Sequence, residues 1–205
     1  MSSATDTEVD ILPGQILQAA LQLYLKHGLK KVTMDDVSRV IGKSRSSIYY
    51  YYKNRDEIFE AVMDALLAEV LHEMETAMEE AGTIAGKIRA FCLAKIRTSE
   101  EKKPLFTAIE AGMNVEEKSN HAKIMIGLHQ RLMKAEAALL KQALSAAVKS
   151  REVRALKPKE QETLIFILLS SIRGIKREMA YENDFSKLHT TVDTLTAVTL
   201  KWLKE

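Results

Sequence analysis

The 205-residue sequence has few of the residues that crosslink chains or interrupt helices. It contains one cysteine, three prolines and eight glycines. Because Cys92 is the only cysteine, an intramolecular disulfide is excluded, and the chain fits a reducing compartment. No apolar run approaches the ~18 residues that suggest a membrane span, and the polar N-terminus does not resemble a signal peptide. We therefore predict a cytoplasmic protein.

The sequence also lacks the alternation of apolar and polar residues that is typical of β-strands. Its hydrophobic residues, 46% of the chain, recur instead at spacings of three and four. This spacing places apolar side chains on one face of a helix. The predicted fold class is all-α.

Motifs that carry common enzyme chemistry are absent. The sequence has no glycine-rich phosphate loop and no nucleophile elbow. Glu69 and His72 have the Glu-x-x-His spacing of di-iron bundles, which need a second such pair. Glu117 and His121 are one residue further apart, so a helical-bundle metalloprotein remains only an alternative. We predict no enzymatic activity, no metal and no other cofactor.

Two short helices are predicted on either side of Gly42. Thr33 can cap the first helix with its hydroxyl, and Ser44 can cap the second. Gly42 follows the last apolar residue of the first helix, where a left-handed residue would end it. In the second helix Ile48 and Tyr51 fall on one side. Two helices joined by a short turn with a glycine form a helix-turn-helix, whose second helix enters the major groove of DNA.

Positive charge is concentrated around this motif. Residues 26–55 contain eight Lys and Arg against two Asp, a net charge of +6, whereas the whole chain carries +2. An ordinary helical hairpin could imitate the motif, but a basic patch confined to it is typical of a phosphate-binding surface. The sequence therefore favours DNA binding.

The stretches ILQAALQLYLKHG and TMDDVSRVIGKSRSSIYYYYKNRDEIF resemble the N-terminal domain of TetR-type transcriptional regulators, over roughly residues 11–64. Ser46 and Lys43 depart from the usual family pattern, which has Gly and an apolar residue there. The resemblance implies a DNA-binding helix-turn-helix domain at residues 1–55 and a helical ligand-binding and dimerisation domain at 56–205, with about nine helices in all. It further implies a sequence-specific repressor of double-stranded operator DNA, released by a small-molecule effector. A constitutive DNA-binding protein without an effector is the alternative.

The predicted DNA contacts divide into two groups. One group would read bases: Arg45, Ser46, Ser47 and Tyr50. The other would hold the DNA backbone: Thr33, Lys43, Ser44, Tyr49, Lys53 and Arg55. Of four consecutive tyrosines on a helix, not all can be buried, and we expect Tyr51 or Tyr52 to pack inward.

Further helices are expected along the rest of the chain. The first runs from about Pro13 to His27, the fourth from 56 to about 80, and the next ends near Ser99 at the polar run SEEKKP, before a short helix at 105–113. A long helix at about 115–148 has its main apolar seam at Ile124, Leu128, Leu132, Ala135, Leu139 and Ala143. The last two helices begin after Pro158 and near Ser186. Because they carry more apolar surface than one chain can cover, we predict a homodimer through them.

The resemblance places the effector among the C-terminal helices, and several residues there suit a pocket. Flexible methionines adapt to irregular shapes, and a charge within an apolar stripe needs a partner. The candidate ligand-binding residues are Phe91, Cys92, Lys95, Phe106, Glu110, Met113, Met125, His129, Met133 and Arg173.

Overall fold

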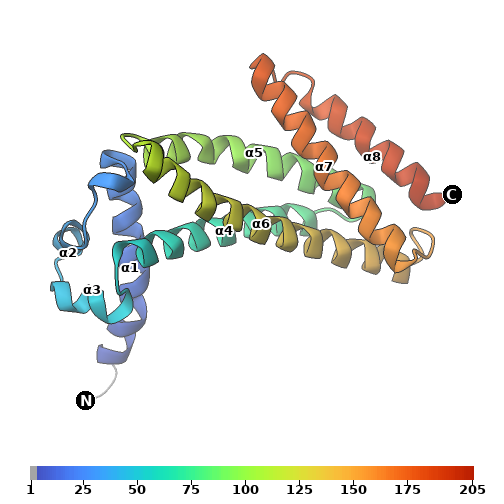
Figure 1. Ribbon diagram of the computed structural model, residues 1–205. Helices are drawn as coiled ribbons and strands as arrows, with labels where there is room; N and C mark the ends of the chain where they lie inside the picture. The colour runs from blue at the N-terminus through green and yellow to red at the C-terminus, as the bar shows by residue number, and fades with distance from the viewer. Residues whose placement is uncertain (1–3) are drawn as a thin grey trace. The chain divides into compact units, whose positions relative to one another are not determined.

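A computed structural model describes residues 4–205, with side chains for residues 12–205. Within this range the chain forms eight α-helices and one 3₁₀-helix and no strand, which confirms the all-α prediction (Figure 1). The elements are α1 (Ala4–His27), η1 (Leu29–Lys31), α2 (Met34–Ile41), α3 (Arg45–Tyr51), α4 (Arg55–Glu79), α5 (Ile84–Glu110), α6 (Val115–Lys149), α7 (Pro158–Glu182) and α8 (Leu188–Lys204). None of the helices described is long and apolar enough to cross a membrane.

The helices form two compact units. Unit 1 contains the chain up to Ala68 together with Lys102–Leu128, and unit 2 contains Glu69–Glu101 and His129–Glu205. Helices α4, α5 and α6 each contribute residues to both units. The division into functional domains at residues 1–55 and 56–205 remains a prediction, because packing alone does not assign function to either part.

The core of unit 1 joins the first four helices. Tyr24 of α1 packs edge-on against Phe59 of α4, with ring centroids 5.9 Å apart. Ile48 of α3 is fully buried in the same cluster, and Val37 brings in α2. Each of these large apolar side chains stabilises the fold by about 1.5–3 kcal/mol when removed from water. The two short helices are therefore held by burial of their inner faces.

The core of unit 2 is built from the C-terminal helices. Phe91 of α5, Leu144 of α6 and Leu168 of α7 are all buried in one cluster. Val192 attaches α8, which lies antiparallel beside α7 (Figure 1). The end of α8 is also tied to the loop between α6 and α7, because the Arg154 N–H donates to the Leu203 carbonyl at 3.0 Å.

Two predicted helix boundaries were wrong, both at prolines. Helix α1 begins at Ala4, so Pro13 lies inside it and not in its first turn. Helix α5 continues through Pro104, where we predicted an end near Ser99 and a separate short helix. A proline removes one backbone hydrogen bond and does not always end a helix. Around Pro104 the helix is held by burial of Ile96 before the proline and of Leu105 and Ile109 after it.

The predicted apolar seam of α6 was only partly right. Leu128 and Ala143 are buried as expected, but Leu140 and Leu144 are buried more deeply than their neighbours in the predicted seam. The fully buried position one turn before Leu140 is Glu136, a charged residue. The buried face therefore follows a spacing of four through Leu128, Glu136, Leu140 and Leu144, which the polarity of Glu136 concealed.

The turn between α2 and α3 has the predicted caps. The Thr33 hydroxyl accepts from the Asp36 N–H at 3.2 Å, and the Asp36 carboxylate accepts from the Thr33 N–H at 3.0 Å. Gly42 ends α2 in the left-handed conformation with φ of 65°, and the Ser44 hydroxyl accepts from the Ser47 N–H at 3.2 Å. Backbone groups that α2 and α3 leave unpaired at these ends are thus satisfied by side chains.

Replacing Thr33 with alanine removes half of this reciprocal cap. We expect Thr33→Ala to lower the free energy of unfolding by about 1 kcal/mol, because an N–H of the first turn of α2 loses its acceptor. The measurement is urea denaturation followed by circular dichroism. Thr33→Ser, which keeps the hydroxyl, is the control and should remain close to wild type; equal losses in both variants would contradict a capping role.

Candidate functional site

Helix α3 presents one exposed polar face. Ile48 is fully buried, whereas Tyr50 is 80% exposed and Tyr49 is 40% exposed. Arg45 and Ser46 at the start of the helix are also exposed. Tyr51 and Tyr52 lie half-buried against the core of unit 1, as the sequence analysis expected. The side chains predicted to read bases therefore share an accessible helix surface, except that Ser47 is half-buried.

Arg45 is held in place by two neighbours. Its Nε lies 3.1 Å from the Asp35 carboxylate of α2, and its terminal nitrogen donates to the Tyr49 hydroxyl at 3.3 Å. The guanidinium also stacks over the Tyr49 ring, 5.4 Å from the centroid. The hydrogen bond to Tyr49 and the charge of Asp35 raise the pKa of Arg45 above its ordinary value. The group is thus a permanent cation at the start of α3.

Three serine hydroxyls gather beside Arg45. The Ser44 Oγ lies 2.8 Å from the Oγ of Ser46 and 2.8 Å from that of Ser47. A hydroxyl can both donate and accept, so each of these groups can exchange a serine partner for a phosphate or a base edge. The cap at the start of α3 and the predicted DNA contacts consequently use the same side chains.

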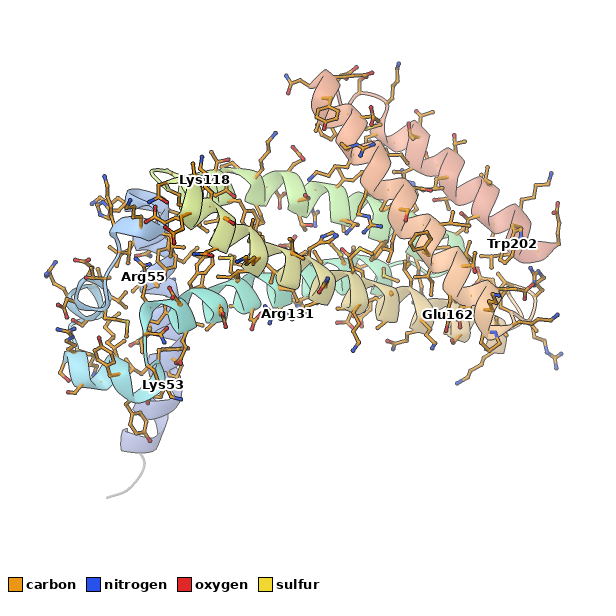
Figure 2. The ribbon with its side chains drawn as sticks, viewed as in Figure 1. Lys53, Arg55, Lys118, Arg131, Glu162 and Trp202 are labelled. Carbon is orange, nitrogen blue, oxygen red and sulfur yellow. The ribbon has the colours of Figure 1, made fainter. Side chains whose placement is uncertain are left out.

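Lys53 and Arg55 flank the beginning of α4 and are labelled in Figure 2. Asn54 caps this helix, since its Oδ1 accepts from the Glu57 N–H at 2.9 Å. Arg55 also donates to the Lys30 carbonyl at the end of η1, at 3.2 Å. The sequence analysis missed this structural contact, because a side chain bond to a backbone 25 residues away leaves no local pattern. Lys53 is exposed and adds positive charge beside this helix terminus.

The predicted ligand-binding residues are divided between the two units. Five belong to unit 2: Phe91, Cys92, Lys95, Met133 and Arg173. Four belong to unit 1: Phe106, Glu110, Met113 and Met125. The tenth, His129, lies in unit 2 but its side chain is exposed. Its place in a ligand pocket remains a prediction.

In unit 1 the sequence analysis missed a buried histidine. His121 is 5% exposed, packs at a tilt against Phe59 with centroids 5.6 Å apart, and has its Nδ1 3.4 Å from the Glu110 carboxylate. Burial lowers the pKa of His121, and the nearby Glu110 opposes that shift. Phe106, Met113 and Met125 are half-buried at the margin of the same core. Glu110 therefore serves as a neighbour of His121 within unit 1.

In unit 2 the two charged residues predicted to bind ligand, Lys95 and Arg173, have partners that the sequence analysis missed. Lys95 pairs with Glu136, whose side chain is fully buried. Arg173 donates to the Met133 sulfur and, at 3.2 Å, to the Ser170 hydroxyl. Phe91 and Cys92 are buried close by, and burial raises the pKa of the Cys92 thiol to about 12. That thiol is consequently protonated and behaves as an apolar side chain.

Metal-binding geometry does not occur in the described part of the chain. No group of three or more His, Cys, Asp or Glu side chains could hold an ion there. Glu69 and His72 are both exposed on α4, without two further carboxylates beside them.

Comparison with known proteins agrees with this geometry. Residues 16–62, from α1 into α4, match the family of bacterial regulatory proteins called the tetR family. The HTH-type transcriptional regulator YhgD of Bacillus subtilis, itself uncharacterised, is 23% identical over 87% of this chain and 86% of its own length. The HTH-type transcriptional repressor AcnR of Corynebacterium jeikeium is 30% identical, over 44% of this chain and 43% of its own.

The fold is also shared with solved structures. A TetR transcription regulator from Haloarcula marismortui superposes with a TM-score of 0.63, at 16% identity, over 94% of this chain and 98% of that one. The match over residues 16–62 assigns the helix-turn-helix segment to the tetR family, and the solved structure shows the shared fold. The chain as a whole is similar to helix-turn-helix transcriptional regulators.

The buried Lys95–Glu136 pair generates a stability prediction. Glu136→Leu leaves Lys95 buried without its counter-ion, and we expect a loss of about 3–5 kcal/mol in the free energy of unfolding. The double substitution Lys95→Met/Glu136→Leu removes both charges and should recover most of that loss. Urea denaturation at one fixed protein concentration measures both variants. A double variant no more stable than Glu136→Leu alone would show that the lost packing matters and the unpaired charge does not.

Proposed function

We propose that the protein is a homodimeric repressor that binds operator DNA through α3 and releases it when a small molecule binds in unit 2. The observation that carries this proposal is the exposed start of α3, where Arg45, Ser46 and Tyr50 project from a helix fixed by its caps. Recognition helices of this motif contact base edges with their N-terminal residues. The printed description of the AcnR relative as a repressor supports the direction of regulation.

Each predicted DNA contact has a role in this proposal. Base edges are met by the exposed face of α3: Arg45, Ser46, Ser47 and Tyr50. Phosphates are met by residues of the caps and of the α4 terminus: Thr33, Lys43, Ser44, Tyr49, Lys53 and Arg55. Phosphate contacts fix the orientation of the protein on the duplex, and base contacts select the sequence. The helix termini at Thr33, Ser44 and Asn54 add backbone N–H groups that suit phosphate oxygens.

The homodimer is proposed to form through α7 and α8. Phe166, Ile167 and Val198 are 65%, 49% and 64% exposed, respectively. A groove of about 560 Å³ also opens along these helices, lined by residues that include Ile175, Leu195 and Val198. A second copy of the chain would cover these apolar side chains around a two-fold axis. It would also present a second recognition helix to a second half-site, as helix-turn-helix dimers do.

Effector release requires two arrangements of the dimer that differ in DNA affinity. A ligand shifts such an equilibrium only by its differential affinity for the two arrangements. Since α4, α5 and α6 run through both units, they are the covalent route by which a change in unit 2 reaches unit 1. Ligand and operator would then weaken each other by the same factor. An operator complex that resists every bound ligand would instead favour a constitutive DNA-binding protein.

Arg45→Ala tests base reading. On a duplex selected from a random library, we expect this variant to lose about 1–3 kcal/mol of binding free energy and to relax the preference at one base pair. On random DNA its affinity should change little. Fluorescence anisotropy of both duplexes measures the difference. Equal losses on the selected and the random duplex would contradict base reading by Arg45.

Lys53→Ala tests phosphate contact and is the matched comparison. It should weaken binding to both duplexes alike and lower the salt dependence of log K by about one unit. Lys53 is preferable to Arg55 for this test, because Arg55 also holds the Lys30 carbonyl and its loss disturbs the fold. An unchanged salt slope in Lys53→Ala would remove Lys53 from the proposed interface.

Dimerisation is tested by placing charge on the apolar face. The double variant Phe166→Glu/Val198→Glu should sediment as a monomer and lose at least about tenfold in operator affinity, because buried unpaired charges are costly. Val115→Glu is the control, since Val115 is 88% exposed but lies outside α7 and α8. A double variant that still sediments as a dimer would place the interface elsewhere.

A further inference from the structure

A group of charged side chains lies inside unit 2, between three helices. Lys95, Ser99 and Glu100 come from α5, Met133 and Glu136 from α6, and Ser170, Arg173 and Lys176 from α7. Lys95 pairs with Glu136, and Lys176 pairs with Ser99 and Glu100. Three cations therefore face two carboxylates. Arg173 is half-buried. Removing a cation from water without a counter-ion is costly, so the excess cation requires a physical reason.

Glu136 is the most deeply buried member of the group. Its side chain is 0% exposed, and one carboxylate oxygen, Oε1, accepts from Lys95. The other, Oε2, is buried and has no hydrogen-bond partner among the described residues. Buried carboxylate oxygens are rarely left without a donor in native proteins. The open acceptor indicates that a donor from outside the chain completes this site.

Arg173 is the cation without a counter-ion. In the described part of the chain no carboxylate lies within ion-pair distance of its guanidinium, which is bonded only to the Ser170 hydroxyl and the Met133 thioether. A thioether is a weak acceptor and a guanidinium has five donors, so most of its capacity is unused. Burial lowers the pKa of Lys95, Glu136 opposes that shift, and the nearby cations Arg173 and Lys176 add to it.

Apolar side chains surround this group on each helix. Phe91 and Cys92 precede Lys95 by one turn of α5, and Leu169 precedes Arg173 by one turn of α7; all three are buried. Residues three and four apart share a helix face. Exposure increases across the charged group, from Glu136, which is fully buried, to Lys176, whose side chain is 32% exposed. The charged group and buried apolar side chains therefore share helix faces on α5 and α7.

We propose that Arg173, Lys95 and Glu136 form the binding site for an organic anion with an apolar body. The anionic group of the ligand, a carboxylate in the simplest case, pairs with the Arg173 guanidinium and displaces the Met133 sulfur. A hydroxyl or amide N–H on the ligand, or a bound water, donates to Glu136 Oε2. The apolar body packs against Phe91, Cys92 and Leu169. This assignment of chemical class rests on the proposed function only where it identifies the anion as the effector.

The experiment is isothermal titration calorimetry on the full-length protein with three probes of equal length. Octanoate should bind at least about tenfold more tightly than 1-octanol, because a charge-assisted pair with Arg173 is available only to the acid. Octylammonium should bind more weakly than 1-octanol, since it adds a fourth cation. Equal binding of octanoate and 1-octanol, or no binding of octanoate, overturns the proposal without the need for any variant.

Two substitutions on α7 then locate the site. Arg173→Met should abolish the advantage of octanoate over 1-octanol, and Arg173→Lys should retain part of it, because the charge remains while the planar fork is lost. Arg177→Met is the matched control: Arg177 lies one turn further along α7, is 67% exposed and pairs with its neighbour Glu178. It should leave octanoate affinity within about twofold of wild type. Octanoate affinity that survives Arg173→Met overturns the assignment.

A parallel anisotropy titration with operator DNA separates this inference from the proposed function. If octanoate binds through Arg173 but operator affinity is unchanged, the anion site stands and effector release fails. If another metabolite releases the operator while octanoate and its relatives do not bind, effector release stands and the anion site fails.

Discussion

The exposed face of α3, which we propose to read DNA, depends on the helix caps before and after Gly42. Helix α3 has only seven residues, and a helix of that length is not stable in water by itself. Its geometry is set from outside: Ser44 caps its start, the left-handed Gly42 fixes the turn, and Ile48 anchors its inner face in the core. The Thr33–Asp36 pair caps the start of α2. With these constraints α3 is presented as a rigid element, which is what base recognition requires.

Neighbouring side chains also fix the position of the Arg45 guanidinium in the free protein. Arg45 is paired with Asp35 and rests on Tyr49, so its side chain is already extended along the exposed face. These exposed contacts are each weak, at about 0–1 kcal/mol, and can be exchanged for stronger contacts to a base. Arg55 makes a different contribution, because its bond to the Lys30 carbonyl connects η1 to the start of α4. Arg45 is thus the side chain that we propose for recognition, whereas Arg55 also contributes to the fold.

The helix-turn-helix could be predicted from the sequence, but the charged pairs inside unit 2 could not. Caps and left-handed glycines act locally, so Thr33, Gly42 and Ser44 could be assigned from spacing alone. The Lys95–Glu136 pair joins residues 41 positions apart, so no local pattern in the sequence connects Glu136 with Lys95. His121 was passed over for a similar reason, since its burial depends on Phe59 of another helix. The helix end near Pro104 was misplaced because packing outweighed the lost hydrogen bond.

A single measurement bears most directly on the central claim that capped α3 helices, one from each protomer, enter successive major grooves. It is hydroxyl-radical and methylation footprinting of the protein on its selected duplex. The account predicts two protected half-sites on one face of the DNA, about one helical turn or ~34–36 Å apart, with protected major-groove guanine N7 atoms in each. A single protected site, or protection confined to the minor groove, would contradict it.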